Sequence, residues 1–361
     1  MTARGEVWKT LAGRRVFLTG HTGFKGSWLV AWLRRLECSV VGYALPPEPR
    51  SLFQQANLQN DLLKQDLADI RDQRRLTDAL QASGCDLVIH MAAQPLVRRS
   101  YKDPVQTWTT NVMGTVHLLE ALRACNNVRA VLVITTDKCY ENREWTWGYR
   151  EIDPLGGNDP YSASKAGTEL VVQSYRQSFF ADRGPLIASA RAGNVIGGGD
   201  WSEDRIIPDA ARAAEAGQPL MVRNPDATRP WQHVLDCLSG YLTLSARLLT
   251  GDRSVASAFN FGPSPNDNLS VEKLLDGLKI YWPAISWQLA PGSTQSSEEE
   301  ANFLYLDSAR ARQVLGWSPH WDLTTALKFT AEWYDCVIRR PDQARVMMFR
   351  QLDHYIDGAC F

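Results

Sequence analysis

The sequence predicts an α/β protein built on a doubly wound parallel sheet, with a smaller C-terminal α/β lobe. Three observations support this fold class. Apolar runs alternate with amphipathic stretches over the first half of the chain, and a glycine-rich turn follows the first run. The chain also has 361 residues, which is more than one hydrophobic core usually serves.

The expected strands are short apolar runs rich in β-branched residues, at 16–19, 40–43, 87–91 and 131–134. Residues 104–125 have the apolar spacing of a helix. Strands that alternate with helices predict parallel pairing, with helices on both faces of the sheet. We expect one side of helix 104–125 to carry Val105, Trp108, Val112, Val116, Leu119 and Leu122, and the tryptophans Trp28, Trp32 and Trp108 to lie in the core.

The second half of the chain is less regular and richer in Gly, Pro and Trp. We therefore expect residues 1–195, together with about 236–265, to form a dinucleotide-binding domain of the Rossmann type. Residues 196–235 and 266–361 would form a smaller lobe that closes over it.

The composition argues against several classes of protein. The formal net charge of −1 provides no general attraction for nucleic acid or an anionic membrane, so neither is an expected partner. No apolar run is long enough to cross a bilayer, and 1–15 does not resemble a secretory signal, so a cytoplasmic location is expected. The seven cysteines and six histidines are dispersed, and no metal site is expected.

A glycine-rich turn at 20–26 follows the first strand and opens a helix. Its glycines permit a tight turn and a close approach to a pyrophosphate, and the helix N-terminus adds partial positive charge. We expect Gly20, Gly23, Phe24 and Gly26 to bind a dinucleotide. A plain glycine turn is the alternative reading.

The identity of the dinucleotide is not decided at this end of the sequence. Residues 43–46 contain no carboxylate for the adenosine ribose of NAD, and no adjacent arginine for the 2′-phosphate of NADP. Asp69 and Ile70 could hold adenine between a carboxylate and an apolar side chain. A surface turn explains the same two residues equally well.

Tyr161 and Lys165 are the most informative pair of residues. Side chains four apart lie on one face of a helix, so the phenol and the ammonium can meet. A nearby cation lowers a tyrosine pKa from about 10 toward neutrality, which would make Tyr161 a general base for a hydroxyl group.

A second polar cluster follows the expected strand at 131–134. Thr136, Asp137 and Lys138 would lie at the carboxyl end of the sheet, where doubly wound folds bind their ligands. A hydroxyl, a carboxylate and an amine together are suited to proton transfer. The alternative, an ordinary polar strand end, is weakened because all three motifs occur in one chain.

These segments together resemble the extended short-chain dehydrogenase/reductase family over nearly the whole chain. The resemblance is closest to members that dehydrate sugar nucleotides, with CDP-glucose as the expected substrate. The segments that carry the family match are 20–26, 88–94, 111–115, 161–165, 191–197, 306–312 and 315–319, and those that carry the closer match are 20–28, 92–98 and 136–140.

The resemblance implies a role for each motif. Thr136 would hydrogen-bond the C4 hydroxyl, Tyr161 would remove its proton, and Lys165 would bind the nicotinamide ribose. Asp137 would protonate the leaving C6 hydroxyl, and epimerases generally lack that residue. The implied cofactor is NAD, regenerated in each turnover to give a 4-keto-6-deoxy sugar nucleotide. Ala92 and Ala93 would also contact the cofactor, and Gln94, Asn194, Arg205 and Arg229 would bind the substrate.

Lys138 departs from the pattern of most hexose dehydratases, which have glutamate at this position. Lysine is a base only when neutral, and lowering its pKa from about 10.4 to 7 disfavours the ammonium by roughly 4 to 5 kcal/mol. Members that act on CDP-glucose share the lysine, so the substitution supports that substrate. We hypothesise that Lys138 removes the C5 proton.

The resemblance also implies a homodimer, formed by helices 104–125 and 161–180, although their apolar stripes would fit internal packing equally well. Two other functions remain open. An epimerase or decarboxylase could use the same fold without needing Asp137. A non-catalytic NAD-sensing protein commonly lacks the tyrosine or the lysine, whereas Tyr161 and Lys165 are both present.

Overall fold

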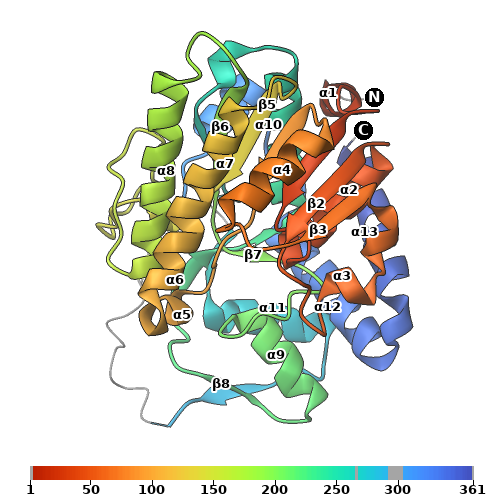
Figure 1. Cartoon of the computed structure of the whole chain (residues 1–361). Coiled ribbons are helices and arrows are strands. Elements are labelled where there is room, and N and C mark those ends of the chain that lie inside the picture. Colours follow the sequence, from red (N-terminus) through yellow and green to blue (C-terminus); the bar gives the residue numbers. More distant parts are fainter. Residues whose placement is uncertain (1–2, 265–266, 292–303, 360–361) are drawn as a thin grey trace.

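A computed structural model describes residues 3–264, 267–291 and 304–359. Its centre is a seven-stranded sheet with the strand order β11-β6-β5-β4-β1-β2-β3, and every neighbouring pair of strands is parallel (Figure 1). The predicted doubly wound α/β fold is therefore confirmed. The strands are β1 (Arg15–Thr19), β2 (Ser39–Ala44), β3 (Lys64–Leu67), β4 (Leu87–His90), β5 (Ala130–Ile134), β6 (Leu186–Ala192) and β11 (Ala258–Phe261).

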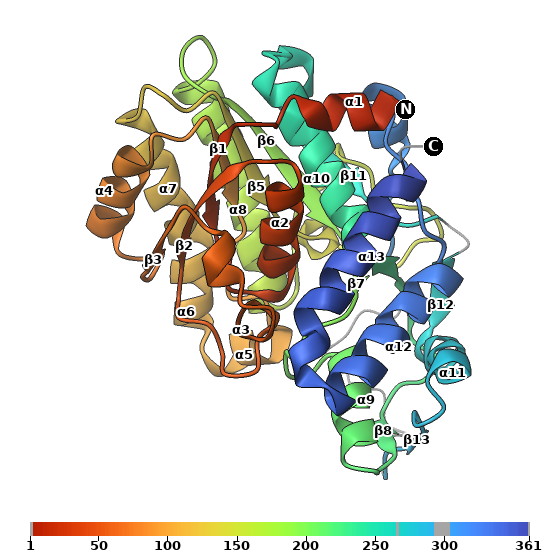
Figure 2. The ribbon, with the colours of Figure 1, turned by 90° about the vertical axis from the view of Figure 1, so that its right-hand side faces the viewer.

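Helices cover both faces of this sheet, as Figure 2 shows. Alternate residues of a strand point to opposite faces, so Phe17 packs in the core beneath one helical layer while Leu18 packs beneath the other. The first layer contains α4 (Gln73–Ser83), α7 (Gly114–Arg123) and α8 (Pro160–Ser178). The second contains α2 (Phe24–Arg35) and α10 (Val234–Leu249), with α1 (Ala3–Lys9) packed on α10.

The rest of the described chain adds three two-stranded ladders and four longer helices near the carboxyl ends of the sheet strands (Figure 1). Helix α13 packs against α2, where the rings of Trp32 and Tyr355 meet edge to face with 5.4 Å between their centroids. The ladders are β7 (Val195–Ile196) with β10 (Gln232–His233), β9 (Thr228–Pro230) with β12 (Asn268–Ser270), and β8 (Leu220–Val222) with β13 (Trp287–Leu289). The helices are α9 (Ile206–Glu215), α11 (Val271–Tyr281), α12 (Leu323–Arg339) and α13 (Ala344–Ala359).

Short elements complete the described chain. They are α3 (Leu52–Gln55), α5 (Val97–Lys102), α6 (Pro104–Trp108), the 3-10 turns η1 (Leu58–Asp61), η3 (Asp137–Cys139), η4 (Arg253–Val255) and η7 (Pro341–Gln343), and the π turns η2 (Thr109–Met113) and η6 (Ala311–Leu315).

The expected helix 104–125 is divided by the π turn η2, and this corrects one prediction. Leu119 and Leu122 are buried, but Val105 is 70% exposed and Trp108 is 41% exposed. A π turn contains about one residue more than an α turn, and each residue advances an α-helix by about 100°. The stripe expected for one continuous helix is therefore rotated before η2, so Trp108 is not a core residue. Trp28 and Trp32 are fully buried, as predicted.

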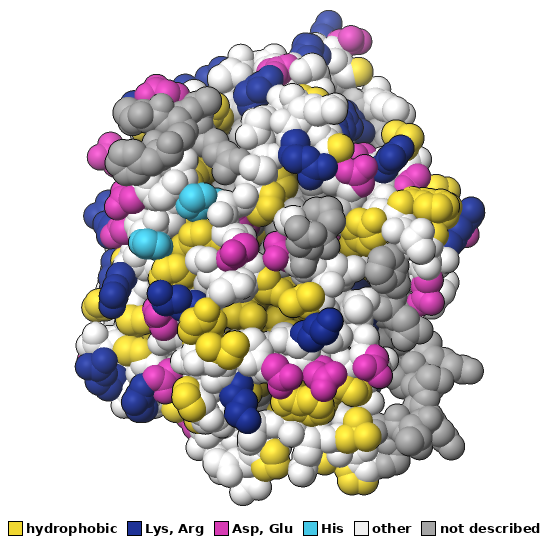
Figure 3. Space-filling view, turned by 180° about the vertical axis from the view of Figure 1, so that it is seen from behind, with side chains coloured by type: hydrophobic (Ala, Val, Ile, Leu, Met, Phe, Trp, Pro, Cys, Tyr) yellow, Lys and Arg dark blue, Asp and Glu magenta, His cyan; other side chains and the backbone are white. Residues whose placement is uncertain are grey.

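The surface fits the near-zero net charge. On the face shown in Figure 3, small groups of basic, acidic and hydrophobic side chains are interspersed. None of the helices in the described ranges is both long and apolar enough to span a membrane.

Candidate active site

The turn after β1 is shaped by glycines that leave no room for a side chain. Gly20 has a positive φ of 74°, and a Cβ there would lie 2.7 Å from the backbone nitrogen of Ala92. A Cβ on Gly26 would lie 2.2 Å from the Gly20 carbonyl oxygen. The first residues of α2 can therefore pack directly against the turn. The free backbone N–H groups at the start of α2 then point outward.

Ala92 and Ala93 follow β4 beside this turn. The backbone nitrogen of Ala92 donates to the Thr19 hydroxyl at 3.1 Å, which ties the end of β4 to the end of β1. Gly23 is the N-cap residue of α2, and Phe24 is its first residue. The ring of Phe24 lies beside Gly197, since a Cβ on that glycine would be 3.4 Å from the ring. The turn therefore adjoins the loop that follows β7.

The predicted adenine residues lie beyond the end of β3, next to β2. The Asp69 carboxylate forms an ion pair with Arg71 at 2.6 Å and keeps partial exposure, while Ile70 is buried beneath Gly114. The Tyr43 hydroxyl donates to the Asp69 carbonyl oxygen at 2.9 Å. A carboxylate and an apolar surface are thus neighbours here, although the arginine shares the carboxylate.

Thr136, Asp137 and Lys138 begin where β5 ends, at the turn η3. The Thr136 hydroxyl donates to the Asp137 carboxyl group at 2.9 Å, and both side chains are buried. Burial raises the pKa of Asp137, against the charge of Lys138 and the bond from Thr136. A Cβ on Gly193 would lie 2.9 Å from a carboxyl oxygen of Asp137, so this glycine leaves the space that the carboxyl group occupies.

Tyr161 and Lys165 lie in the first turns of α8. Asp159 caps this helix by accepting from the backbone nitrogen of Ser162 at 2.9 Å, and the Tyr161 nitrogen donates to the Ser100 hydroxyl at 3.2 Å. The phenol of Tyr161 hydrogen-bonds Thr136 and lies close enough to Asp137 to feel its charge. The structure therefore brings the two predicted catalytic clusters into one buried site.

Lys165 is not among the groups with the largest effects on the pKa of Tyr161 in this arrangement. Burial raises the pKa of Tyr161 to about 12, and the opposing effects come from the Thr136 hydrogen bond and the charge of Arg205. The Lys165 ammonium instead donates to the carbonyl oxygen of Ile134 at 3.2 Å. Burial and the charge of Lys25 lower the pKa of Lys165 to about 8.

Gln94 is held by the protein, which gives little support to its predicted contact with substrate. Its side-chain nitrogen donates to the Thr107 hydroxyl at 2.9 Å and the Leu96 carbonyl oxygen at 3.1 Å, and its side-chain oxygen accepts from the Leu96 nitrogen. Its backbone is joined to Asn111 of η2, whose side-chain nitrogen donates to Ser164 of α8 at 2.8 Å. Gln94 therefore helps to hold α8 in place through Asn111.

Two of the predicted substrate residues, Arg205 and Arg229, lie near the same site. Arg205 forms an ion pair with Asp200 at 2.9 Å, yet 36% of its side chain stays exposed. Its charge lowers the pKa of Tyr161, and the charge of Arg229 in β9 lowers that of Asp137, so both guanidinium groups lie near the catalytic side chains. Asn194 follows Gly193, and its carbonyl oxygen accepts from the Gln232 nitrogen at 3.1 Å.

The structure also reveals residues that the sequence did not single out. Lys25 lies 6.0 Å from the centre of the Tyr241 ring and acts electrostatically on Lys165. A lysine in the first turn of a helix is unfavourable because its charge opposes the helix dipole. This unusual position was the sequence signal that could have pointed to Lys25. Asp200 and the buried pair of Glu169 with Arg191 had no local signal, because the contacts that explain them come from other elements.

Comparisons of the sequence with known proteins give two extensive matches. The family described as GDP-mannose 4,6 dehydratase matches residues 17–330. The CDP-glucose 4,6-dehydratase of Salmonella typhimurium is 47% identical over 353 residues, which are 96% of this chain and 97% of the relative.

Solved structures share the fold. The dTDP-glucose 4,6-dehydratase of Streptomyces venezuelae, solved with NAD bound, has a TM-score of 0.73 and 25% identity, covering 89% of this chain and 97% of that one. The UDP-glucuronic acid 4-epimerase of Bacillus cereus, in complex with UDP-glucuronic acid and NAD, has a TM-score of 0.76 at 24% identity, covering 90% and 99%. The second likeness shows the fold alone.

Proposed function

This chain belongs to the GDP-mannose 4,6-dehydratase family of extended short-chain dehydrogenases/reductases, and from that membership we propose that it converts CDP-glucose to CDP-4-keto-6-deoxyglucose. One observation carries the choice of dehydration. A buried carboxyl group with a raised pKa, that of Asp137, lies directly against Thr136 and beside Tyr161. Loss of a hydroxyl as water requires an acid, and a raised pKa makes a carboxyl group better suited to donate the proton.

The cofactor is NAD, and the turn after β1 fits it. The close approaches at Gly20 and Gly26 leave a bare backbone surface beside the N-terminus of α2, which suits a pyrophosphate. Phe24, Ala92 and Ala93 border that surface, and Asp69 and Ile70 would meet the adenine end. When bound, NAD supplies an acceptor for the hydride of C4 and the hydride that returns to C6.

Oxidation at C4 requires a base and an orienting group. Tyr161 would remove the proton of the C4 hydroxyl while Thr136, hydrogen-bonded to Tyr161, orients that hydroxyl. Because burial raises the pKa of Tyr161 to about 12, the phenolate must be stabilised as the site fills. Lys165 and Arg205 are nearby cations that can do so.

Elimination across C5 and C6 requires an acid and a second base. Asp137 would protonate the C6 hydroxyl as it leaves, and Lys138, the next residue along η3, would remove the C5 proton made acidic by the C4 ketone. In the variant Lys138→Met, exchange of the C5 hydrogen with solvent should be lost. Full exchange in that variant would exclude this role for Lys138.

Arg205 and Arg229 would bind the diphosphate of the substrate, with Asn194 contributing from the loop after β6. A guanidinium group pairs well with phosphate oxygens. Arg205 supports this best, since Asp200 fixes one edge of its guanidinium while 36% of the side chain stays open. Gln94 would affect the substrate only indirectly, by helping to hold α8 in place.

We also propose a cytoplasmic homodimer of two lobes, with the domain boundaries predicted from the sequence. Four exposed apolar side chains lie on α6, η2 and α8, which pack together: Val105, Trp108, Met113 and Leu170. Burial of these side chains against a second copy would remove them from water. Light scattering at micromolar concentration should give the dimer mass, and a monomer would contradict the proposal.

The decisive experiment is incubation of the purified protein with NAD and, separately, CDP-glucose, dTDP-glucose and GDP-mannose. The 4-keto-6-deoxy product absorbs in alkali and is lighter than its substrate by one water. We expect this product from CDP-glucose. Turnover of the dTDP sugar alone would retain the chemistry and reject the CDP substrate, whereas an epimerised product that keeps its C6 oxygen would reject dehydration.

A further inference from the structure

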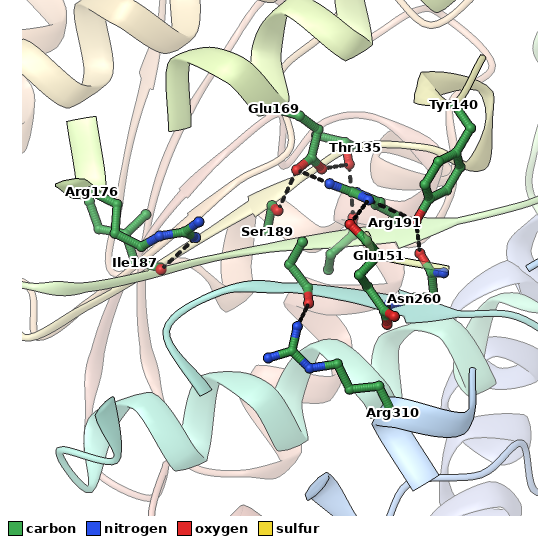
Figure 4. A network of polar contacts seen from close by, with 12 residues as sticks. Thr135, Tyr140, Glu151, Glu169, Arg176, Ile187, Ser189, Arg191, Asn260 and Arg310 are labelled. Carbon is green, nitrogen blue, oxygen red and sulfur yellow. Dashed lines mark hydrogen bonds and ion pairs between the residues drawn. The ribbon is translucent and has the colours of Figure 1, made fainter. Parts of the chain in front are cut away.

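A buried ion pair joins Glu169 of α8 to Arg191 of β6 (Figure 4). We propose that this pair is a positioning unit, which holds both ends of the segment 136–139 and thereby sets Asp137 and Lys138 against Tyr161. The inference rests on the proposed function, because it concerns the elimination step.

The N-terminal end of the segment is held by Glu169. The hydroxyl of Thr135, the residue before Thr136, donates to one oxygen of the Glu169 carboxylate at 2.5 Å. The backbone nitrogen of Thr135 also donates to the Ala190 carbonyl oxygen at 2.9 Å, which ties this point to β6. The residue that enters the segment is thus fixed through its side chain and its backbone.

The C-terminal end is held by Arg191. Its guanidinium donates to the hydroxyl of Tyr140, the residue after Cys139, at 2.7 Å and lies 4.9 Å from the centre of the Tyr140 ring. The Tyr140 hydroxyl in turn donates to Asn260 at 2.7 Å. The chain that leaves the segment is therefore anchored to β6 and β11.

The two anchors are joined to each other and to the catalytic helix. Arg191 donates to the second oxygen of Glu169 at 2.8 Å, and both side chains are buried. Glu169 lies one helical turn beyond Lys165 and two beyond Tyr161 on α8. A shift of α8 would therefore move Thr135 and Tyr140 with it. The distance between Tyr161 and the segment that carries Asp137 and Lys138 would then stay the same.

The chemistry of the pair suits this role. Burial acts to raise the pKa of Glu169, but the charge and hydrogen bond of Arg191, with bonds from Thr135 and Ser189, outweigh it and lower the pKa. A charged carboxylate with directed donors fixes geometry more strictly than apolar packing does. Ser189 completes the set from β6, where its hydroxyl donates to Glu169 at 2.7 Å without being part of the segment.

The test uses variants that break one anchor and leave the ion pair intact. Thr135→Val and Tyr140→Phe each remove one hydroxyl and keep the shape of the side chain nearly constant. Thr135→Ser is the matched conservative variant, since it keeps the hydroxyl. Ser189→Ala is the control. It removes a hydrogen bond to the same Glu169 carboxylate, but Ser189 lies on β6 and is not linked to the segment 136–139.

The measurement compares kinetic isotope effects for CDP-glucose deuterated at C4 and at C5. In Thr135→Val and Tyr140→Phe, kcat should fall about 3- to 10-fold, as expected for one hydrogen bond, with KM nearly unchanged. The C5 isotope effect should rise, because proton removal at C5 becomes slower than the other steps. Thr135→Ser and Ser189→Ala should resemble the unaltered protein.

A purely structural role predicts a different result. Partial unfolding lowers the amount of active protein and the melting temperature, but it leaves both isotope effects unchanged. That outcome, or an equal rise in Ser189→Ala, would overturn the inference. Failure of the unaltered protein to convert CDP-glucose would instead reject the proposed function, so the two failures are distinguishable.

Discussion

Two buried carboxyl groups near the same strand ends differ in how the protein treats them. Glu169 and Asp137 are each only 3% exposed. Glu169 has an arginine at 2.8 Å and hydroxyl donors from Thr135 and Ser189, and its pKa is lowered. Asp137 has the bond from Thr136, a backbone bond from Lys138 and the charges of Lys138 and Arg229, yet burial outweighs them and its pKa is raised.

The difference shows that burial alone does not determine the charge of a carboxyl group. Short bonds from charged and neutral donors offset the loss of water at Glu169, which stays ionised and fixes structure. With weaker compensation, the pKa of Asp137 is raised, which favours the protonated form that a general acid requires. Three experiments test this contrast.

The largest effect is expected from Asp137→Asn. If Asp137 is the acid, kcat for the 4-keto-6-deoxy product should fall about 100- to 10,000-fold, because asparagine keeps the shape but cannot donate the proton. Urea denaturation should show no loss of stability at neutral pH. A kcat within about threefold of the unaltered protein would exclude the role. A loss of stability as large as that of a Glu169 variant would show that the two carboxyl groups contribute to stability in the same way.

The next effect concerns Glu169→Gln, which leaves the Arg191 charge buried without its counter-ion. The free energy of unfolding at pH 7 should fall by about 3 to 5 kcal/mol. Glu215→Gln is the matched control, since Glu215 pairs with Arg50 at 2.7 Å on the surface. That variant should lose less than about 1 kcal/mol. Equal losses, measured by urea denaturation, would show that burial of the Glu169 pair has no special effect.

The smallest effect is a difference of sign with pH. Burial raises the pKa of Asp137 above its ordinary 3.8, so its contribution to stability is complete below that pH and declines as pH rises through the raised pKa. The stability of Asp137→Asn relative to the unaltered protein should therefore increase from pH 4 to pH 8. The increase is about 1.4 kcal/mol for each pH unit that separates the pKa of Asp137 in the folded and unfolded chains.

Glu169→Gln should behave in the opposite way. The lowered pKa of Glu169 means that its contribution is complete above its ordinary value of 4.5 and declines at lower pH. The deficit of this variant should therefore shrink as pH falls below 4.5. Urea denaturation of both variants at several pH values from about 2 to 8 measures the two slopes, and slopes of the same sign would contradict the contrast.

The sequence predicted the strands whose residues are mostly apolar. The expected run at 16–19 is β1, and those at 40–43, 87–91 and 131–134 are β2, β4 and β5, with only their ends displaced. A strand buried on both faces appears as a continuous apolar run. The sequence alone could therefore place the centre of the sheet.

Strand β6 was not among the expected strands, although it lies beside β5. Its segment contains Ser189 and Arg191, which interrupt the apolar signal. Both residues are tolerated there because Glu169 reaches them from α8. A charge that is neutralised by another element cannot be recognised from the local pattern.

The candidate catalytic residues were predicted by motif and resemblance, and the structure brings Thr136, Asp137, Tyr161 and Lys165 near the end of β5. Their electrostatics were harder to predict. The sequence suggested that Lys165 would lower the pKa of Tyr161, but the Lys165 ammonium points to a backbone carbonyl and burial dominates. Only three-dimensional placement shows which cation faces which acid.

The π turn η2 matters to anyone who redesigns this protein. Removal of one residue within 109–113 would give a more regular helix, of the kind that protein designers prefer. It would also turn Asn111 away from Gln94 and Ser164, the contacts through which η2 seats α8. In this helix, a more regular backbone would remove contacts that hold α8 in place, so a redesign should keep the irregular turn.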